Sequence, residues 1–186
     1  NIKIIYILIL CLFIHCSKDT DYLFDSGYSM FNSSLNFEGD EDTLDIITWN
    51  IENYPKDNAT NFFVYEIIDS LNVDIIALQE IKDQASLTNL TESLGNNWYS
   101  YRSGSASSDW QELAFLINTS QVDIITNPYT ILNDYEYEFA SREPLVLECS
   151  YNNQLLILIN VHYKCCDGSE DRRLAASNLL YDYINN

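Results

Sequence analysis

The stretch that most limits the folds open to this chain is LLILINV, residues 155–161. It is apolar almost throughout rather than at alternate positions. A strand with one face in water alternates apolar and polar side chains, whereas a continuous apolar run indicates a strand covered on both faces. We therefore expect a helix layer on one face and a second sheet on the other. The pattern predicts a mixed α/β (α+β) sandwich of two sheets flanked by helices.

Other segments fit that architecture. β-rich runs predict strands at 44–49, 73–78, 98–102, 112–118, 122–126, 142–149 and 155–164. Helices are expected at 59–71, between a capping Asp83 and Gly95, and from Ser169 to Ile184. The segment SYNNQ before residue 155 predicts a tight hairpin, because Asn tolerates the positive φ of such turns. We expect the last helix to present one face formed by Leu174, Ser177, Tyr181 and Ile184.

The N-terminal segment resembles an export signal. An apolar run from residue 4 to 14 precedes Cys16 and is too short for a membrane span, which is typical of a signal peptide. Cys16, followed by Ser-Lys-Asp, resembles the lipidated cysteine of bacterial lipoproteins, although His15 departs from the small residue usual there. We expect residues 1–16 to be a signal peptide of an outer-membrane, cell-surface or extracellular protein. A buried strand or helix is the alternative.

The acidic, aperiodic residues 17–43 then predict a flexible tether, and residues 44–186 a single domain. The chain begins with Asn1 and ends inside the expected last helix. We therefore expect a fragment, incomplete at the C-terminus. We expect contact with the membrane through a lipid anchor only. No protein partner is indicated, and we expect a monomer.

The net charge of −19 argues against a broad electrostatic contact with nucleic acid, which needs a basic face. It leaves open a site that handles phosphate through a divalent cation, since the ion supplies positive charge locally. It equally suits a secreted protein kept soluble by its acidity. The second half carries most of the basic residues of the expected domain: Arg102, Arg142, Lys164, Arg172 and Arg173.

Four polar residues lie at the ends of apolar runs: Asn50, Glu80, Arg142 and His162. A carboxylate suits Mg²⁺, an Asn can orient it, Arg can hold two phosphate oxygens, and His can donate to a leaving oxygen. Together they indicate metal-assisted hydrolysis of a phosphoester. Singly, each has an ordinary structural explanation, such as a solvated strand end or a turn. A hairpin turn centred on residues 152 and 153 would place residue 143 opposite His162, making Arg142 its neighbour.

The order of these residues resembles a known family. TWNIEN (48–53), IIALQEI (75–81), FASREPLVLE (139–148) and LINVHYK (158–164) are similar, in order, to the first half of the endonuclease/exonuclease/phosphatase superfamily. The resemblance covers residues 44–186. It implies a four-layer αββα sandwich, of which this chain is the N-terminal part, and Mg²⁺-dependent phosphodiester or phosphomonoester hydrolysis. Mn²⁺ and Ca²⁺ are the alternative ions.

The resemblance also implies roles for individual residues. Glu80 matches the metal-binding glutamate, and Asn50 the asparagine near metal and phosphate. Arg142 matches a phosphate-contacting arginine of pancreatic-type deoxyribonucleases, and His162 matches the proton-donor histidine of those enzymes and of bacterial sphingomyelinases. Exonuclease III-like nucleases carry tyrosine at the position of His162, which argues against that branch. The segment KCCDG, followed by EDRR, resembles secreted nuclease-like proteins of marine Bacteroidetes.

These matches favour an exported endonuclease acting on extracellular DNA or RNA. The alternatives are a sphingomyelinase-like or nucleotide phosphodiesterase or phosphatase, and a surface binding module that has lost catalysis. The family's Gly-Asp-x-Asn and Asp-His elements would follow residue 186, so we expect these residues alone to bind metal weakly and to hydrolyse nothing.

The sequence allows more than one interpretation of two further segments. The loop SGSASSDWQ (103–111) is either a polar hairpin connection or a border of the site, with Gln111 and Glu112 facing it. Cys165 and Cys166 can form a vicinal disulfide, bond elsewhere or remain free.

Overall fold

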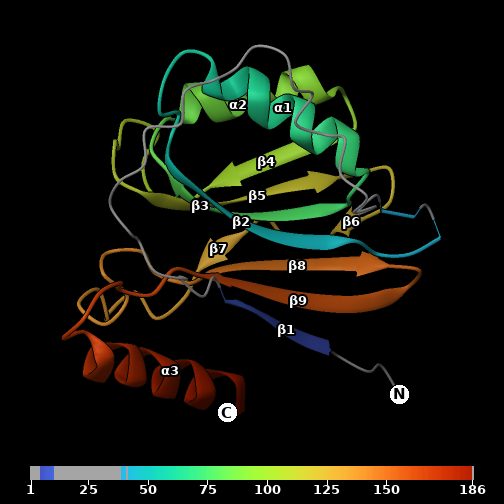
Figure 1. The fold of residues 1–186 in the computed structure, drawn as a ribbon. Helices are drawn as coiled ribbons and strands as arrows, with labels where there is room; N and C mark the ends of the chain where they lie inside the picture. The colour runs from blue at the N-terminus through green and yellow to red at the C-terminus, as the bar shows by residue number, and fades with distance from the viewer. Residues whose placement is uncertain (1–4, 11–38, 41, 186) are drawn as a thin grey trace.

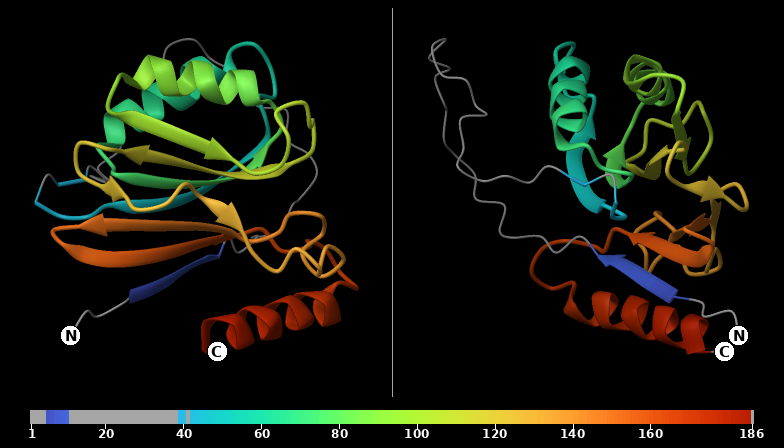
Figure 2. Two further views of the ribbon diagram at one scale, coloured as in Figure 1. Left: turned by 180° about the vertical axis from the view of Figure 1, so that it is seen from behind. Right: turned by 90° about the vertical axis from the view of Figure 1, so that its right-hand side faces the viewer.

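The fold is a four-layer α/β sandwich, seen in a computed structural model that describes residues 5–10, 39–40 and 42–185 (Figure 1). Two helices cover one sheet, a second sheet packs beneath it, and the third helix covers the far face of that second sheet (Figures 1 and 2). The described helices are α1 (Thr60–Leu71), α2 (Gln84–Leu94) and α3 (Glu170–Asn185). The αββα arrangement expected from the sequence is confirmed.

The upper sheet has the strand order β2-β3-β5-β4 and the lower one β1-β9-β8-β6, with β7 also paired to β8. The upper strands are β2 (Ile46–Tyr54), β3 (Ile75–Ile81), β4 (Trp98–Arg102) and β5 (Glu112–Asn118). The lower strands are β1 (Ile5–Leu10), β6 (Asp123–Ile124), β7 (Tyr129–Thr130), β8 (Leu145–Tyr151) and β9 (Gln154–Val161).

Strand β9 is covered on both faces, as its apolar run predicts. Leu156 and Leu158 belong to the core between the two sheets. Ile159 and Val161 belong to a second core, shared with Ala176 of α3. A third core lies between the upper sheet and helices α1 and α2. The two-sided burial of one strand therefore fixes the order of three of the four layers.

The β8–β9 hairpin has the predicted register. Asn152 and Asn153 both adopt positive φ values, 50° and 62°, as a two-residue turn of this kind requires. Leu145 pairs with Asn160, which places the residues just before β8 beside those just after β9. Arg142 and His162 are thereby brought to the same end of the lower sheet.

Several predicted boundaries are wrong. Strand β2 continues to Tyr54, so Asn50 lies within it rather than at its end. Strand β8 begins at Leu145 rather than residue 142, because Pro144 before it has no N–H for the ladder. The strand expected at 122–126 is reduced to two residues.

The predicted face of the last helix is correct only for Ser177 and Ile184. Leu174 and Tyr181 are 61% and 67% exposed, while Ala176 and Leu180 are buried against the lower sheet. Ile184 of the predicted face packs against the same core, so the buried face is a shifted one that contains Ala176 and Leu180 in place of Leu174 and Tyr181.

At the N-terminal end, β1 pairs in parallel with β9, from Ile5 opposite Leu156 to Leu10 opposite Val161. Residues 5–10 of the predicted signal peptide thus form a strand, which was the alternative for this segment, and the signal peptide stays a prediction. Cys16 and most of the expected tether lie outside the described residues, so lipidation and the tether also stay predictions. In the described part of the chain, no helix is long and apolar enough to cross a membrane.

Candidate active site

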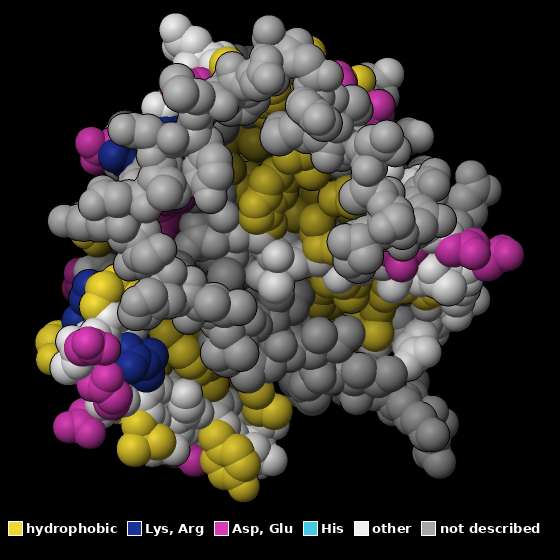
Figure 3. Space-filling model, in the orientation of Figure 1, with side chains coloured by type: hydrophobic (Ala, Val, Ile, Leu, Met, Phe, Trp, Pro, Cys, Tyr) yellow, Lys and Arg dark blue, Asp and Glu magenta, His cyan; other side chains and the backbone are white. Residues whose placement is uncertain are grey.

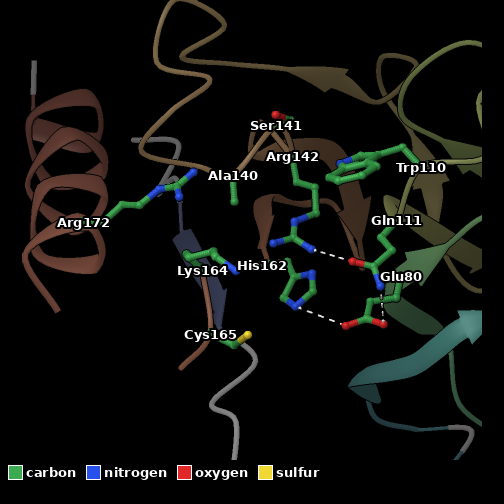
Figure 4. Close-up of a pocket in the computed structure, with 10 residues that line it drawn as sticks. All are labelled: Glu80, Trp110, Gln111, Ala140, Ser141, Arg142, His162, Lys164, Cys165 and Arg172. Atoms are coloured by element: carbon green, nitrogen blue, oxygen red, sulfur yellow. Dashed lines mark hydrogen bonds and ion pairs between the residues drawn. The ribbon is translucent and has the colours of Figure 1, made fainter. Parts of the chain in front are cut away.

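A pocket of about 380 Å³ opens at one end of the two sheets (Figure 4). The upper sheet and its loop contribute one wall, and the ends of β8 and β9 with the start of α3 contribute the other. The residues that line it are Glu80, Trp110, Gln111, Ala140, Ser141, Arg142, His162, Lys164, Cys165 and Arg172. Three of the four predicted site residues are in this set. The fourth, Asn50, contacts Glu80 directly.

Glu80 is delivered to the pocket by an irregularity in β3. Its φ is 64°, a left-handed backbone conformation that side-chain-bearing residues rarely adopt. The register shifts at this point against both neighbours, between Asn50 and Tyr54 on β2 and between Leu78 and Ile81 on β3. A backbone held in such a conformation is a feature that clusters at functional sites. The apolar strand thus turns a carboxylate out toward the pocket without leaving the sheet.

Three donors hold the Glu80 carboxylate. Asn50 Nδ2 donates to Oε1 at 3.1 Å, while the backbone N–H of Asn53 and Nε2 of Gln111 donate to Oε2 at 3.2 and 3.1 Å. Gln111 Nε2 also donates to Asn53 Oδ1 at 2.8 Å. Glu80 is 9% exposed, so these bonds fix the orientation of a largely buried carboxylate.

Gln79, the neighbour of Glu80 on β3, points the other way. Its Nε2 donates to Asn160 Oδ1 at 2.7 Å and to Thr48 Oγ1 at 3.1 Å, inside the core between the sheets. Asn160 Nδ2 donates to the carbonyls of Leu78 and Ala114, at 2.9 and 3.0 Å. These bonds join β9 to β3 and β5. They fix the position of His162, two residues beyond Asn160, relative to Glu80.

His162 lies directly after β9 and is 2% exposed. Its Nε2 is 3.6 Å from Glu80 Oε1 (Figure 4). Burial, together with the positive charges of Arg142 and Lys164, lowers the pKa of His162 from 6.5 to about 3. The imidazole is therefore neutral at neutral pH, and its contact with Glu80 is a polar contact rather than a charge pair.

Arg142 reaches the pocket from a sharp turn. Ala140 and Ser141 before it have φ values of 56° and 57°, and Arg142 itself is 6% exposed. Its Nη1 donates to Gln111 Oε1 at 3.0 Å. Burial lowers the pKa of Arg142, an effect that the charge of Glu80 opposes. The amide of Gln111 therefore links the carboxylate of one wall to the guanidinium of the other.

The loop at 103–111 is built around a buried arginine. The Arg102 guanidinium donates to the carbonyls of Ile81, Lys82, Ser105, Ser108 and Trp110 at 2.8–3.1 Å. Glu112 accepts from Ser103 Oγ and Ser108 Oγ, both at 3.1 Å, and so faces this loop rather than the pocket. Of the two residues considered for the site, only Gln111 lines it.

The oxygen atoms of Glu80 and Asn50 suit a hard divalent cation. Asn50 Oδ1 is buried without a hydrogen-bond partner among the described residues, although Asn50 Nδ2 binds Glu80. An amide oxygen left open beside a carboxylate is the oxygen set that Mg²⁺ takes, with water and phosphate oxygens completing its shell. The described residues contain no group of three or more His, Cys, Asp or Glu side chains that could hold a metal ion. The residues present therefore fit an ion bound through one carboxylate and shared with a substrate.

Six of the lining residues were not predicted individually: Trp110, Ala140, Ser141, Lys164, Cys165 and Arg172. The sequence pattern showed only that basic residues concentrate in the second half of the chain. The Sγ atoms of Cys165 and Cys166 lie 2.7 Å apart without a disulfide between them, and Cys149 is a buried free thiol.

The sequence matches no family model and no curated protein. Solved structures do match it. The crystal structure of D. rerio TDP2 complexed with single strand DNA product has a TM-score of 0.64 and 16% identity, and the match covers 77% of this chain and 55% of that one. An endonuclease/exonuclease/phosphatase family protein from Bacteroides thetaiotaomicron has a TM-score of 0.57 and 11% identity, over 76% and 58% of the two chains.

A mannosyl-6-phosphatase, also from Bacteroides thetaiotaomicron, has a TM-score of 0.56 and 12% identity, and the match covers 76% of this chain and 59% of that one. At these identities the likeness concerns the fold. The chain spans between 55% and 59% of the length of these three structures.

Proposed function

We propose that this chain, which has the fold of the endonuclease/exonuclease/phosphatase superfamily, carries a metal-dependent phosphoester hydrolase site. The observation that carries the proposal is the meeting of Glu80, Arg142 and His162 in one pocket. They come from segments far apart in the sequence. Each can take one role in a phosphoester reaction. Glu80 supplies a carboxylate for a metal ion, Arg142 a positive charge for the phosphate, and His162 a hydrogen-bond donor for the leaving oxygen.

On the upper wall, Glu80 and Asn50 would hold Mg²⁺, with Mn²⁺ and Ca²⁺ as alternatives. The ion would supply positive charge to the phosphate oxygens and lower the cost of charge developing on them. Asn50, Asn53 and Gln111 keep the carboxylate in one orientation. A ligand held in place by further hydrogen bonds loses less freedom when the ion binds.

On the lower wall, Arg142 would bind the phosphate undergoing hydrolysis. Its guanidinium makes one hydrogen bond to the neutral Gln111 amide, and the other terminal nitrogen can donate to a phosphate oxygen. His162 would donate a hydrogen bond or a proton to the leaving oxygen. The negative charge of a bound phosphate favours the protonated imidazole, which the free pocket disfavours.

Nucleic acid is the substrate class that we favour, in an exported endonuclease. The TDP2 structure with single strand DNA product supports it by analogy of fold. A phosphomonoesterase is the second candidate, supported by the likeness to the mannosyl-6-phosphatase and by a net charge of −19, which suits a small substrate. We further propose that the protein is a monomer on the cell surface or outside it, with Cys16 as a lipid attachment site.

The test compares Mg²⁺ with EDTA on plasmid DNA, RNA, sphingomyelin and a sugar phosphate, using the intact gene product beside residues 1–186. We expect Mg²⁺-dependent cleavage of nucleic acid by the former. Glu80→Gln and His162→Ala should each lower the rate by about 100-fold or more, since general acid–base groups contribute factors of that size. Wild-type rates in either variant would contradict the assigned roles.

Mass spectrometry of the protein from its native membrane tests lipidation of Cys16.

A further inference from the structure

The pocket collects positive charge in a strongly acidic chain. Of the nine Lys and Arg residues in the sequence, three line it: Arg142, Lys164 and Arg172. Glu80 is the one acidic residue among the ten that line the pocket. On the face drawn in Figure 3, the larger groups of basic side chains lie at the lower left, beside the start of α3, with acidic side chains next to them and others at the right and upper edges.

None of the three cations forms an ion pair with a carboxylate in the described part of the chain. Two basic residues outside the pocket do so: Lys56 pairs with Glu52 at 2.9 Å and Arg173 with Glu170 at 3.2 Å. In a chain with 28 acidic residues, carboxylates are abundant. Cations that face a pocket without a carboxylate partner can accept an anion from solution without breaking an existing ion pair.

The cations also act on one another. The charge of Arg172 is among the effects that lower the pKa of Arg142, after burial. Positive groups close enough to interact repel one another. A bound anion relieves that repulsion, so the arrangement favours negatively charged ligands.

Arg172 is held with its fork toward the pocket. Its guanidinium stacks over the Tyr137 ring, 4.2 Å from the centroid, and its Nε donates to the Tyr137 carbonyl. The Arg173 side chain donates to the carbonyls of Lys164 and Cys166, which fixes the backbone that carries Lys164. In Figure 4, His162 lies between Glu80 and Lys164, and Arg172 lies farther from Glu80 than Lys164 does.

We propose that Lys164 and Arg172 form a second phosphate subsite, so that the preferred substrate is a nucleic acid strand with a phosphate next to the one being hydrolysed. The inference rests on the proposed function, since Arg142 and His162 define the first phosphate. An isolated phosphomonoester or a choline phospholipid carries a single phosphate and would leave the second subsite empty.

Trp110 favours a single strand. It is 50% exposed and lines the same pocket. An exposed indole beside a short row of cations is the combination that binds single-stranded nucleic acid, with bases stacked on the ring and phosphates held by the cations. A duplex would need a longer basic surface, which a chain of this net charge lacks.

The experiment measures binding by residues 1–186 in EDTA, so that hydrolysis does not interfere. The probes are the dinucleotide TpT, with one phosphate, its two phosphorylated forms pTpT and TpTp, and thymidine diphosphate. We expect one of the two phosphorylated dinucleotides to bind about tenfold more tightly than TpT, because a charge-assisted phosphate contact contributes roughly that factor. Thymidine diphosphate, whose phosphates share one bridging oxygen, should gain less.

The variants Lys164→Ala and Arg172→Gln should each remove most of this gain and leave TpT binding unchanged. Arg172→Gln keeps a donor for the Tyr137 carbonyl. Each should also lower the slope of log affinity against log salt by about 0.7, the contribution of one phosphate contact on a single strand. Lys56→Ala is the matched control, since Lys56 is ion-paired outside the pocket, and it should change neither quantity.

Equal binding of TpT, pTpT and TpTp would overturn the second subsite. Equal weakening of all probes by Lys164→Ala would do the same, because it would indicate a general electrostatic effect. Tightest binding of thymidine diphosphate would assign the cations to a nucleotide instead of a strand. Failure of the proposed function looks different: TpT would not bind at all, and Arg142→Ala would have no effect on any probe.

Discussion

The two walls of the pocket are built on different principles. On the upper wall, Glu80 is fixed by three hydrogen bonds from Asn50, Asn53 and Gln111. On the lower wall, Arg142 donates to one neutral amide, and Lys164 has no side-chain hydrogen bond or ion pair in the described part of the chain. One wall is rigid and carries the negative charge, while the other carries excess positive charge with few partners.

The difference separates two tasks. A cation site needs oxygens at set positions, because Mg²⁺ demands near-ideal geometry. A phosphate site needs charge more than geometry, since Lys binds phosphate as a point charge on a flexible stem. The upper wall is therefore suited to position an ion, and the lower wall to attract and retain the substrate.

The largest effect is expected where the upper wall gains its rigidity. Arg102→Ala removes the donors to the carbonyls of Ile81, Lys82, Ser105, Ser108 and Trp110. Partly buried carbonyls left without donors should lower the free energy of unfolding by about 3 kcal/mol. Urea denaturation measures it.

The matched control for that change is Arg173→Ala on the lower wall. Arg173 also donates to two carbonyls, those of Lys164 and Cys166, but its side chain is 33% exposed. Water can replace it, so a loss below about 1 kcal/mol is expected. Equal losses in the two variants would mean that the walls do not differ in rigidity.

The next effect concerns the ion. Glu80→Gln should weaken Mn²⁺ binding by about 100-fold, since it removes the charged ligand. It should leave TpT binding in EDTA within a factor of about three, because the phosphate is bound by the other wall. The control is Glu112→Gln, a buried carboxylate of similar exposure that bonds to Ser103 and Ser108 instead. Isothermal titration of Mn²⁺ should show no change there.

The smallest effect tests the link between the walls. Gln111→Ala removes one bond to Glu80 and one to Arg142, and should weaken both Mn²⁺ and TpT binding by about tenfold or less. Gln111→Glu should separate the two, strengthening Mn²⁺ binding by adding charge near Glu80 and weakening TpT binding by repelling phosphate. Parallel changes in the second variant would show that the side chain acts only through packing.

The sequence was sufficient where local patterns decide the structure. The continuous apolar run of β9 predicts two covered faces, and paired Asn residues predict the turn that sets Arg142 beside His162. Both depend on near neighbours in the chain. The resemblance then related Asn50, Glu80, Arg142 and His162 to one reaction, and the structure brings them together.

The rest depends on contacts between distant residues. Gln79 bonds to Asn160, 81 positions away, so no local pattern could show that it points away from Glu80. Arg102 shapes the loop that presents Gln111 through carbonyls on two segments. Arg172 reaches the pocket from α3. The buried face of that helix is set by packing against the lower sheet, which a local pattern does not show.

If the signal peptide predicted for residues 1–16 is cleaved, the parallel pairing of β1 with β9 is lost. Maturation at Cys16 would remove all six residues that pair with β9, from Ile5 to Leu10. The mature protein would then present a bare, apolar strand edge, which other chains can extend. The precursor and the processed form would thus differ in self-association. Comparing their light scattering would show whether residues 1–16 also reduce aggregation until they are removed.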